Sequence, residues 1–245
     1  MTDKTRTLIL TGASRGIGHA TVRRFSEAGW RIITCSRDEV PEACQFDPNW
    51  AHHIPTDLGD AGDLETFIDK ANEHIGDGGL AALVNNAAVS PKTPYKERLG
   101  CLNGDEEAWR EVFELNFFVP LKLCRGLAAA LHRGKGAVVN ITSIAGHQAH
   151  PFAGSAYSVS KAALSSLTRE LAVEFAGAGA SVHICGRRRE PLDTLAAGHD
   201  TITAHQLDVT DEGATETMFD TIGPVEIVIA NAGIAGSAPL HRTTS

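Results

Sequence analysis

A tyrosine and a lysine lie four residues apart in Tyr157-Ser-Val-Ser-Lys161, near the start of a predicted helix. In a helix this spacing puts both side chains on one face, about one turn apart. Because a nearby ammonium stabilises a phenolate, the pair could pass a proton to or from a substrate oxygen near neutral pH. The pair alone is a weak signal, since tyrosine and lysine meet at this spacing by chance in many helices.

A glycine-rich segment, TGASRGIG at 11–18, follows an apolar run and precedes an amphipathic stretch. Its three glycines permit a tight turn and let the backbone approach a pyrophosphate. A helix N-terminus adds unpaired N–H donors and a partial positive charge. The spacing differs from the commoner G-x-G-x-x-G fingerprint, and a turn without a ligand is the alternative. Its place at the first strand–helix junction favours a phosphate site.

The residues after the second predicted strand bear on which dinucleotide would bind. The strand ends Cys35-Ser36-Arg37, with no carboxylate at the position that would bind the adenosine ribose of NAD. Arg15 and Arg37 can form forked, charge-assisted hydrogen bonds with a 2′-phosphate. We therefore prefer NADP(H) and keep NAD(H) as possible, because Asp38 is adjacent. The alternative is that both arginines are solvated surface residues.

Composition narrows the class of protein. The 245 residues are 42% hydrophobic and 21% charged, which is ordinary for a packed domain, and the net charge of −8 argues against nucleic-acid binding. No run of about 18 apolar residues predicts a membrane span. Five cysteines without a C-x-x-C pair indicate reduced thiols in a cytoplasmic protein. Adjacent His52 and His53 would point to opposite faces of a strand, so we expect no metal site.

Apolar runs and amphipathic stretches alternate along the chain. The runs predict strands at 6–10, 31–35, 52–55, 80–85 and 137–142. The periodicity predicts helices at about 61–75, 105–131 and 155–175. This alternation indicates an α/β, Rossmann-like, doubly wound parallel sheet with helices on both faces.

The motifs occur in one order at regular intervals. They are TGASRGIG at 11–18, Asp57 in PTDLGD, NNAA at 85–88, Asn116 in ELNFF, Ser143 in ITSIAG, and the Tyr157/Lys161 pair. From residue 6 to about 178 the chain resembles the short-chain dehydrogenase/reductase family. One departure is Ala88, where the family usually has glycine.

The resemblance implies an NADP(H)-dependent oxidoreductase that interconverts a ketone and a secondary alcohol. The implied catalytic residues are Asn116, supporting a water relay, Ser143, orienting the substrate oxygen, Tyr157, the acid/base, and Lys161, which binds the nicotinamide ribose. The implied cofactor-binding residues around the pyrophosphate are Gly12, Ser14, Arg15, Gly16, Ile17 and Gly18. Those implied around the adenosine are Asp57, Leu58, Asn85 and Ala87, to which the charge argument adds Arg37. The resemblance also implies a homodimer through helices 105–131 and 155–175.

The C-terminal segment departs from this pattern. Residues 175–187 align with residues 25–37 at a constant offset of 150, while LDVTD at 207–211 and ANAG at 230–233 echo TDLGD and NNAA. We interpret 175–245 as a second, partial copy of the family's early region; ordinary divergence is the alternative. We divide the chain into a catalytic region, 1–178, and an atypical segment, 179–245, packed on the same sheet. Because this segment replaces the substrate lid, a catalytically impaired nucleotide-binding or interaction protein is the alternative function.

Overall fold

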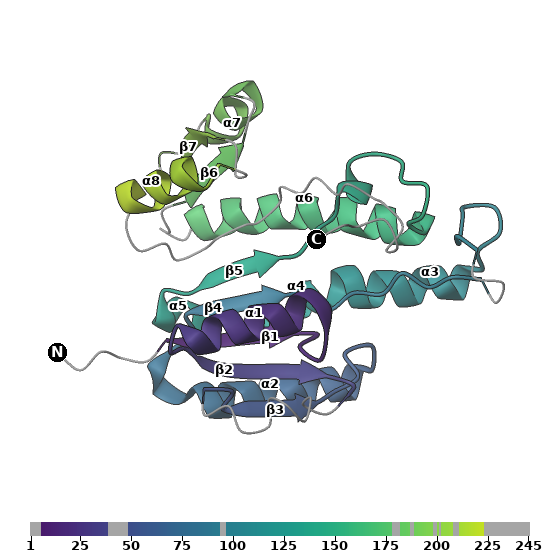
Figure 1. Cartoon of the computed structure of the whole chain (residues 1–245), viewed down its shortest axis with the longest axis horizontal. Coiled ribbons are helices and arrows are strands. Elements are labelled where there is room, and N and C mark those ends of the chain that lie inside the picture. Colours follow the sequence, from purple (N-terminus) through teal and green to yellow (C-terminus); the bar gives the residue numbers. More distant parts are fainter. Residues whose placement is uncertain are drawn as a thin grey trace, which may run out of the picture.

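The computed structural model describes residues 6–38, 49–93, 97–177, 182–186, 189–197, 200, 202–207 and 211–222 (Figure 1). Its centre is a five-stranded sheet in the order β3-β2-β1-β4-β5, in which every neighbouring pair is parallel. The strands are β1 (Thr7–Thr11), β2 (Arg31–Ser36), β3 (His52–Pro55), β4 (Ala82–Asn85) and β5 (Ala137–Asn140). All five lie where the apolar runs predicted them, within two residues at each end.

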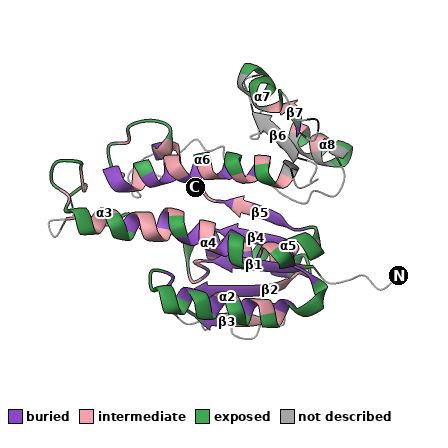
Figure 2. Cartoon of the chain, turned by 180° about the vertical axis from the view of Figure 1, so that it is seen from behind, coloured by how far each residue is buried: buried purple, intermediate pink, exposed green. Residues whose placement is uncertain are grey.

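Helices cover both faces of this sheet (Figures 1 and 2). Leu8 and Leu10 of β1 pack in one cluster with Val22 of α1 (Gly16–Glu27), whereas Ile9 packs on the opposite face. The helices on that opposite face are α2 (Ala61–Ile75), α4 (Val119–Gly126) and α5 (Ala128–Gly134). This arrangement confirms the predicted doubly wound, Rossmann-like fold. Among the described helices, none has both the length and the apolar character needed to cross a membrane.

The predicted long helix at 105–131 is interrupted. It consists of α3 (Glu106–Phe113), a π-helical turn at Glu114–Phe118, α4 and α5. The Val119 N–H donates to the carbonyl of Glu114, five residues back. Pro120 has no N–H to donate to the carbonyl of Asn116, so a regular α-helical ladder cannot pass this point.

We expected residues 179–245 to pack on the same sheet, but the strands that the structure describes in this segment do not join the five-stranded sheet. After α6 (Ser155–Gly177), strands β6 (Val182–Gly186) and β7 (Ile202–Gln206) pair with each other in a separate two-stranded parallel sheet. Two helices accompany them, α7 (Arg189–Ala196) and α8 (Glu212–Ile222). This unit contacts the end of α6, where Ile202 packs against Ala172 and Val173.

The separate sheet reproduces β2 and β3 of the first copy. The strand registers correspond: Ile33 is the register partner of His52 in the first pair, and His183 is the register partner of Thr203 in the second. Each following helix is directly preceded by an aspartate whose carboxylate accepts an N–H three residues on: Asp60 from Asp63 (2.9 Å) and Asp211 from Ala214 (3.0 Å). The β6–β7 pair thus corresponds to the β2–β3 pair in its register and in the cap of the helix that follows. The middle three residues of LDVTD, 208–210, and the ANAG segment at 230–233 lie outside the described residues.

Candidate active site

The turn between β1 and α1 requires glycine at three positions. Gly12 and Gly16 have φ values of +73° and +58°, in the left-handed region that side chains disfavour. At Gly18 an added Cβ would lie 2.1 Å from the carbonyl oxygen of Gly12. The three glycines are therefore fixed by the tightness of this turn, as expected for a loop whose backbone must approach a ligand.

The start of α1 leaves groups available for a phosphate. Within the described part of the chain, the N-cap residue Arg15 makes no side-chain hydrogen bond that would cap this helix, so it leaves the N–H groups of the first turn without a side-chain acceptor of its own. Ile17 is 65% exposed, which is unusual for an isoleucine at a helix start. Uncapped amides, the positive end of the helix dipole and an apolar side chain beside them fit the pyrophosphate of a dinucleotide.

Asn86 and Thr11, which the sequence reasoning left out, lock this turn to the end of β4. The Thr11 hydroxyl accepts from the N–H groups of Asn86 (3.1 Å) and Ala87 (3.0 Å). The Asn86 amide donates to the carbonyls of Thr11 and Gly12, both at 3.0 Å. The NNAA motif could have predicted this role of Asn86, because a polar side chain directly after a strand is well placed to hold a neighbouring loop by hydrogen bonds.

Asn85 lies differently from its implied role beside the ribose. Its side chain is 3% exposed and donates to the side chain of Asn140 (2.8 Å), inside the fold. Asn140 in turn donates to Thr168 of α6 (3.0 Å). The side chain thus ties β4 to β5 and, through Asn140, to α6.

The other residues implied around the adenosine lie after β2 and β3. Asp57 is exposed, and its carboxylate accepts from the N–H of Gly59 (3.0 Å), while Leu58 is buried in the core. Arg37 is exposed directly after β2. The Ser14 hydroxyl lies 3.5 Å from the carboxylate of Asp38. An exposed guanidinium and an exposed carboxylate, those of Arg37 and Asp38, therefore both directly follow β2.

Lys161 is buried below Tyr157. Its ammonium donates to the carbonyl of Ile141 (2.6 Å) and lies 5.8 Å from the centre of the Tyr157 ring. With the residue only 2% exposed, burial lowers the pKa of Lys161 to about 8. The predicted one-face arrangement of this pair is therefore present, with the lysine held by the residue that directly follows β5.

Asn116 lies within the π-helical turn and is fully buried. Its side chain accepts from the N–H of Val89 (2.8 Å) and donates to the Val89 carbonyl (2.9 Å). It also donates to Ser160 (3.1 Å), whose hydroxyl donates to the carbonyl of Tyr157 (2.8 Å). Asn116 thus connects the segment after β4 with the helix that carries Tyr157 and Lys161.

Ser143 begins a short 3-10 turn, Ile144–Gly146, after β5. Its hydroxyl accepts from the N–H of Ala145 (3.2 Å). The turn packs tightly on α6, because a Cβ on Gly146 would lie 2.9 Å from the carbonyl carbon of Lys161. Ser143 is therefore held on a rigid turn that touches the helix of the Tyr157/Lys161 pair.

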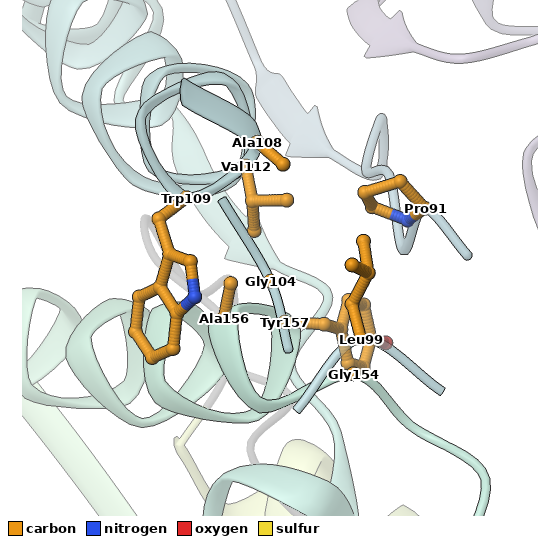
Figure 3. Close-up of a pocket in the computed structure, with 9 residues that line it drawn as sticks. All are labelled: Pro91, Leu99, Gly104, Ala108, Trp109, Val112, Gly154, Ala156 and Tyr157. Carbon is orange, nitrogen blue, oxygen red and sulfur yellow. The ribbon is translucent and has the colours of Figure 1, made fainter. Parts of the chain in front are cut away.

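Tyr157 borders a small pocket between α3, α6 and the loop that precedes α3 (Figure 3). None of its nine lining residues is charged; they are Pro91, Leu99, Gly104, Ala108, Trp109, Val112, Gly154, Ala156 and Tyr157. Four of them, Pro91, Leu99, Gly104 and Gly154, belong to the loops at 90–104 and 145–154, to which the sequence assigns most of the substrate choice, and Tyr157 is the implied acid/base.

A doubly wound sheet with a glycine turn after β1 and a tyrosine–lysine pair on the helix after β5 defines a dinucleotide-binding type of α/β protein. Two stretches of the chain, residues 6–184 and 169–245, match the family described as short chain dehydrogenase. The chain belongs to the short-chain dehydrogenase/reductase family. The second match confirms that the C-terminal segment repeats family sequence.

Relatives and solved structures agree with this membership. The chain is 49% identical over 179 residues to Protein FixR of Bradyrhizobium diazoefficiens, covering 73% of this chain and 64% of the relative. It is 33% identical over 182 residues to a fatty acyl-CoA reductase of Mycobacterium tuberculosis, covering 70% and 58%. The chain thus spans about three fifths of the length of these two relatives.

Among solved structures, a Brucella ovis oxidoreductase of the same family, in complex with a partially ordered NAD, has 43% sequence identity and a TM-score of 0.67. The match covers 89% of this chain and 91% of that one. This similarity agrees with the membership of the chain in the short-chain dehydrogenase/reductase family.

Proposed function

We propose that this protein is an NADP(H)-dependent oxidoreductase that interconverts a ketone and a secondary alcohol. The observation that carries the proposal is the Lys161 ammonium, 5.8 Å from the ring centre of Tyr157, whose ring in turn borders an apolar pocket. Such a pair serves proton transfer to an oxygen, which is the half of carbonyl reduction that the protein must supply.

The proposed mechanism divides the work between cofactor and chain. A bound nicotinamide would supply or accept the hydride. In the reductive direction the Tyr157 hydroxyl donates its proton to the substrate oxygen, and the Lys161 ammonium stabilises the phenolate left behind. Ser143 would hold the same oxygen by a hydrogen bond. Asn116 would fix the segment after β4 against α6 and support the water relay to Lys161.

The preference for NADP(H) is supported by the exposed side chains of Arg15 and Arg37 near the loop and the end of β2. A 2′-phosphate offers these guanidinium groups a dianion that NAD lacks. The exposed carboxylate of Asp38, 3.5 Å from Ser14, favours NAD(H) instead and defines the competing cofactor.

A second candidate is a nucleotide-binding protein with impaired catalysis. The observation that favours it is the pairing of β6 with β7 instead of with β5, which leaves the described C-terminal part outside the main sheet. The substrate lid of the family would normally follow here, so its replacement removes a wall of the site.

NADPH oxidation with a panel of ketones, together with calorimetric titration of NADPH, tests the two candidates. We expect ketone-dependent oxidation that Tyr157→Phe lowers by at least ~100-fold, the contribution typical of a general acid/base, with NADPH affinity retained. Binding of NADPH without oxidation of any ketone, and no effect of Tyr157→Phe, would favour the second candidate.

We also propose a homodimer formed through the α3–α4 region and α6, with the protein acting in the cytoplasm. Phe118 is 41% exposed and Val159 is 46% exposed, one on each of these elements, and burying them would favour association. A cytoplasmic location would keep the thiols of Cys35, Cys101 and Cys124 reduced. Sedimentation analysis should give a dimer that Phe118→Glu converts to a monomer.

A further inference from the structure

His53 connects the buried core to the residues that directly follow β2. It lies in β3, and its register partner in β2 is Thr34. Its Nδ1 lies 2.8 Å from the hydroxyl of Thr34, and its Nε2 lies 2.9 Å from the main-chain carbonyl of Asp38. The imidazole ring therefore makes a polar contact at each of its two nitrogens, one within the sheet and one beyond the end of β2.

The partners of this ring fix which nitrogen carries the hydrogen. A carbonyl oxygen can only accept, so Nε2 of His53 is the donor to Asp38. In the neutral ring Nδ1 is then an acceptor, and the Thr34 hydroxyl donates to it. The indole N–H of Trp50 can only donate, and its acceptor is the same Thr34 hydroxyl (2.6 Å). The hydrogen bonds thus run in one direction, from Trp50 to the carbonyl of Asp38.

The first members of this series are held in the core. Thr34 is fully buried, and Trp50 is 8% exposed. Trp50 packs with Leu8 of β1 and Val22 of α1 in the cluster on the α1 face of the sheet. Its indole meets the His53 ring edge-on, with the ring centroids 6.1 Å apart. Because close packing restricts buried side chains to few rotamers, the His53 ring is fixed from the core side.

The last member of the series is the backbone of Asp38. Its carbonyl accepts from Nε2 of His53 and from the hydroxyl of Ser36 (2.7 Å). The carboxylate of the same residue lies 3.5 Å from the hydroxyl of Ser14, in the turn between β1 and α1. Arg37 lies between Ser36 and Asp38, and its side chain is exposed. Holding both neighbours limits the positions that the Arg37 guanidinium can reach.

We infer that His53 is a positioning residue for cofactor choice, whose bond to Asp38 orders the residues after β2 so that Arg37 can receive a 2′-phosphate. The inference rests on the proposed function, because it names a residue that sets the preference for NADP(H) at the same site. An ordered guanidinium loses less conformational freedom on binding, which raises the affinity for the group that it contacts. NAD(H) lacks the 2′-phosphate, so its affinity should depend little on His53.

The neighbouring His52 provides a matched control. The two adjacent histidines point to opposite faces of β3, as the strand period predicted. His52 stacks on His74 of α2, with the ring centroids 3.6 Å apart, and its Nε2 lies 3.2 Å from a guanidinium nitrogen of Arg31. Arg31 is the first residue of β2, at the opposite end of the strand from Arg37. A substitution of His52 therefore alters β3 without removing a bond to Asp38.

Calorimetric titration of NADPH and NADH tests the inference through the ratio of the two dissociation constants. In His53→Asn the side chain is too short to reach Asp38. We expect the NADPH affinity of this variant to fall about 10-fold and the NADH affinity to change less than about 2-fold, the scale of ordering one charged side chain on binding. In His53→Gln an amide nitrogen can replace Nε2 as the donor, so the ratio should stay close to that of the unmodified chain. His52→Gln should keep the ratio as well.

The outcomes separate the inference from the proposed function. An unchanged ratio in His53→Asn, or an equal fall in His53→Gln or His52→Gln, would overturn the inference and leave the oxidoreductase function standing. A fall confined to His53→Asn, if the unmodified chain oxidises NADPH with none of the ketones, would overturn the proposed catalysis and support the role of His53. Tighter binding of NADH than of NADPH by the unmodified chain would overturn both.

A second measurement uses the unmodified chain and does not depend on the folding of a variant. The nitrogen-15 NMR shifts of the His53 ring, recorded at about pH 8.5 where imidazole is ordinarily neutral, report which nitrogen carries the hydrogen. We expect the hydrogen on Nε2 and none on Nδ1. A ring with its hydrogen on Nδ1 cannot donate to the carbonyl of Asp38, and this result would overturn the inference.

Discussion

The ammonium of Lys161 lies 5.8 Å from the centre of the Tyr157 ring while it donates to the carbonyl of Ile141. Burial lowers the pKa of this lysine from its ordinary 10.5 to about 8, since the charged form has lost hydration. The ammonium that stabilises a phenolate is therefore present at neutral pH and is lost as the pH rises past about 8.

This burial predicts a pH-dependent difference in stability between the unmodified chain and Lys161→Met. Between about pH 8 and 10.5 the unfolded chain still holds the lysine proton that the folded chain has released. The unmodified chain should thus gain stability relative to the variant across this window, by about 3 kcal/mol in total. Urea unfolding of both proteins from pH 7 to 10.5 measures the difference, and a flat or falling difference would contradict it.

Gly18→Ala should disrupt the turn between β1 and α1. The new Cβ would meet the Gly12 carbonyl at 2.1 Å, so the backbone must shift. We expect a loss of about 1–3 kcal/mol in the free energy of unfolding, together with a large loss of NADPH affinity by calorimetry. Gly78→Ala is the control, since no atom lies within 4 Å of its Cβ position. Equal effects of the two substitutions would refute a specific role for the turn.

Arg37→Ala should change which cofactor binds. If its guanidinium contacts a 2′-phosphate, NADPH affinity should fall by about 1.5–3 kcal/mol, the value of a hydrogen bond to a charged group, while NADH affinity should change little. Titration calorimetry with both nucleotides measures this. Arg23→Ala, an exposed arginine on α1, is the control. A parallel loss for both nucleotides would rule out recognition of the phosphate.

Asn116→Leu should destabilise the protein although its volume is nearly conserved. It would leave the N–H and carbonyl of the partly buried Val89 without the side-chain partner that the fully buried Asn116 provides. We expect a loss of about 2–4 kcal/mol, because unpaired buried groups keep their desolvation cost. Asn72→Ala, which removes bonds to the carbonyls of Ile68 and Gly126 nearer the surface, should cost about 1 kcal/mol. Chemical unfolding tests this ranking, and a reversed order would contradict it.

Ile202→Asp should loosen the C-terminal unit without affecting the main sheet. Ile202 is 7% exposed and packs on Ala172 of α6, so a charge there must be hydrated. Hydrogen exchange by mass spectrometry should show faster exchange in β6 and β7 and unchanged exchange in β1. Thr203→Asp, at an exposed position of the same strand, should leave both unchanged. Faster exchange in β1 would show that the unit is coupled to the sheet.

Local chain geometry explains what could be predicted from the sequence. Strand and helix periods are set by the backbone, so the five strands of the main sheet and the one-face Tyr157/Lys161 pair followed from spacing alone. The glycines of the first turn followed as well, because only glycine tolerates that backbone. The offset of 150 residues likewise exposed the partial copy, since repetition is a property of the chain and not of its packing.

Only the tertiary structure decided how distant segments meet. Asn85 and Asn86 look equivalent in sequence, but β4 packing buries one against Asn140 and turns the other toward Thr11. Arg98 reaches Ser155 through loops whose folding no local pattern encodes. The second copy pairs its strands with each other and not with β5. Which residues and strands meet across long sequence separations depends on the packing of the whole chain. A short stretch of sequence does not determine that packing.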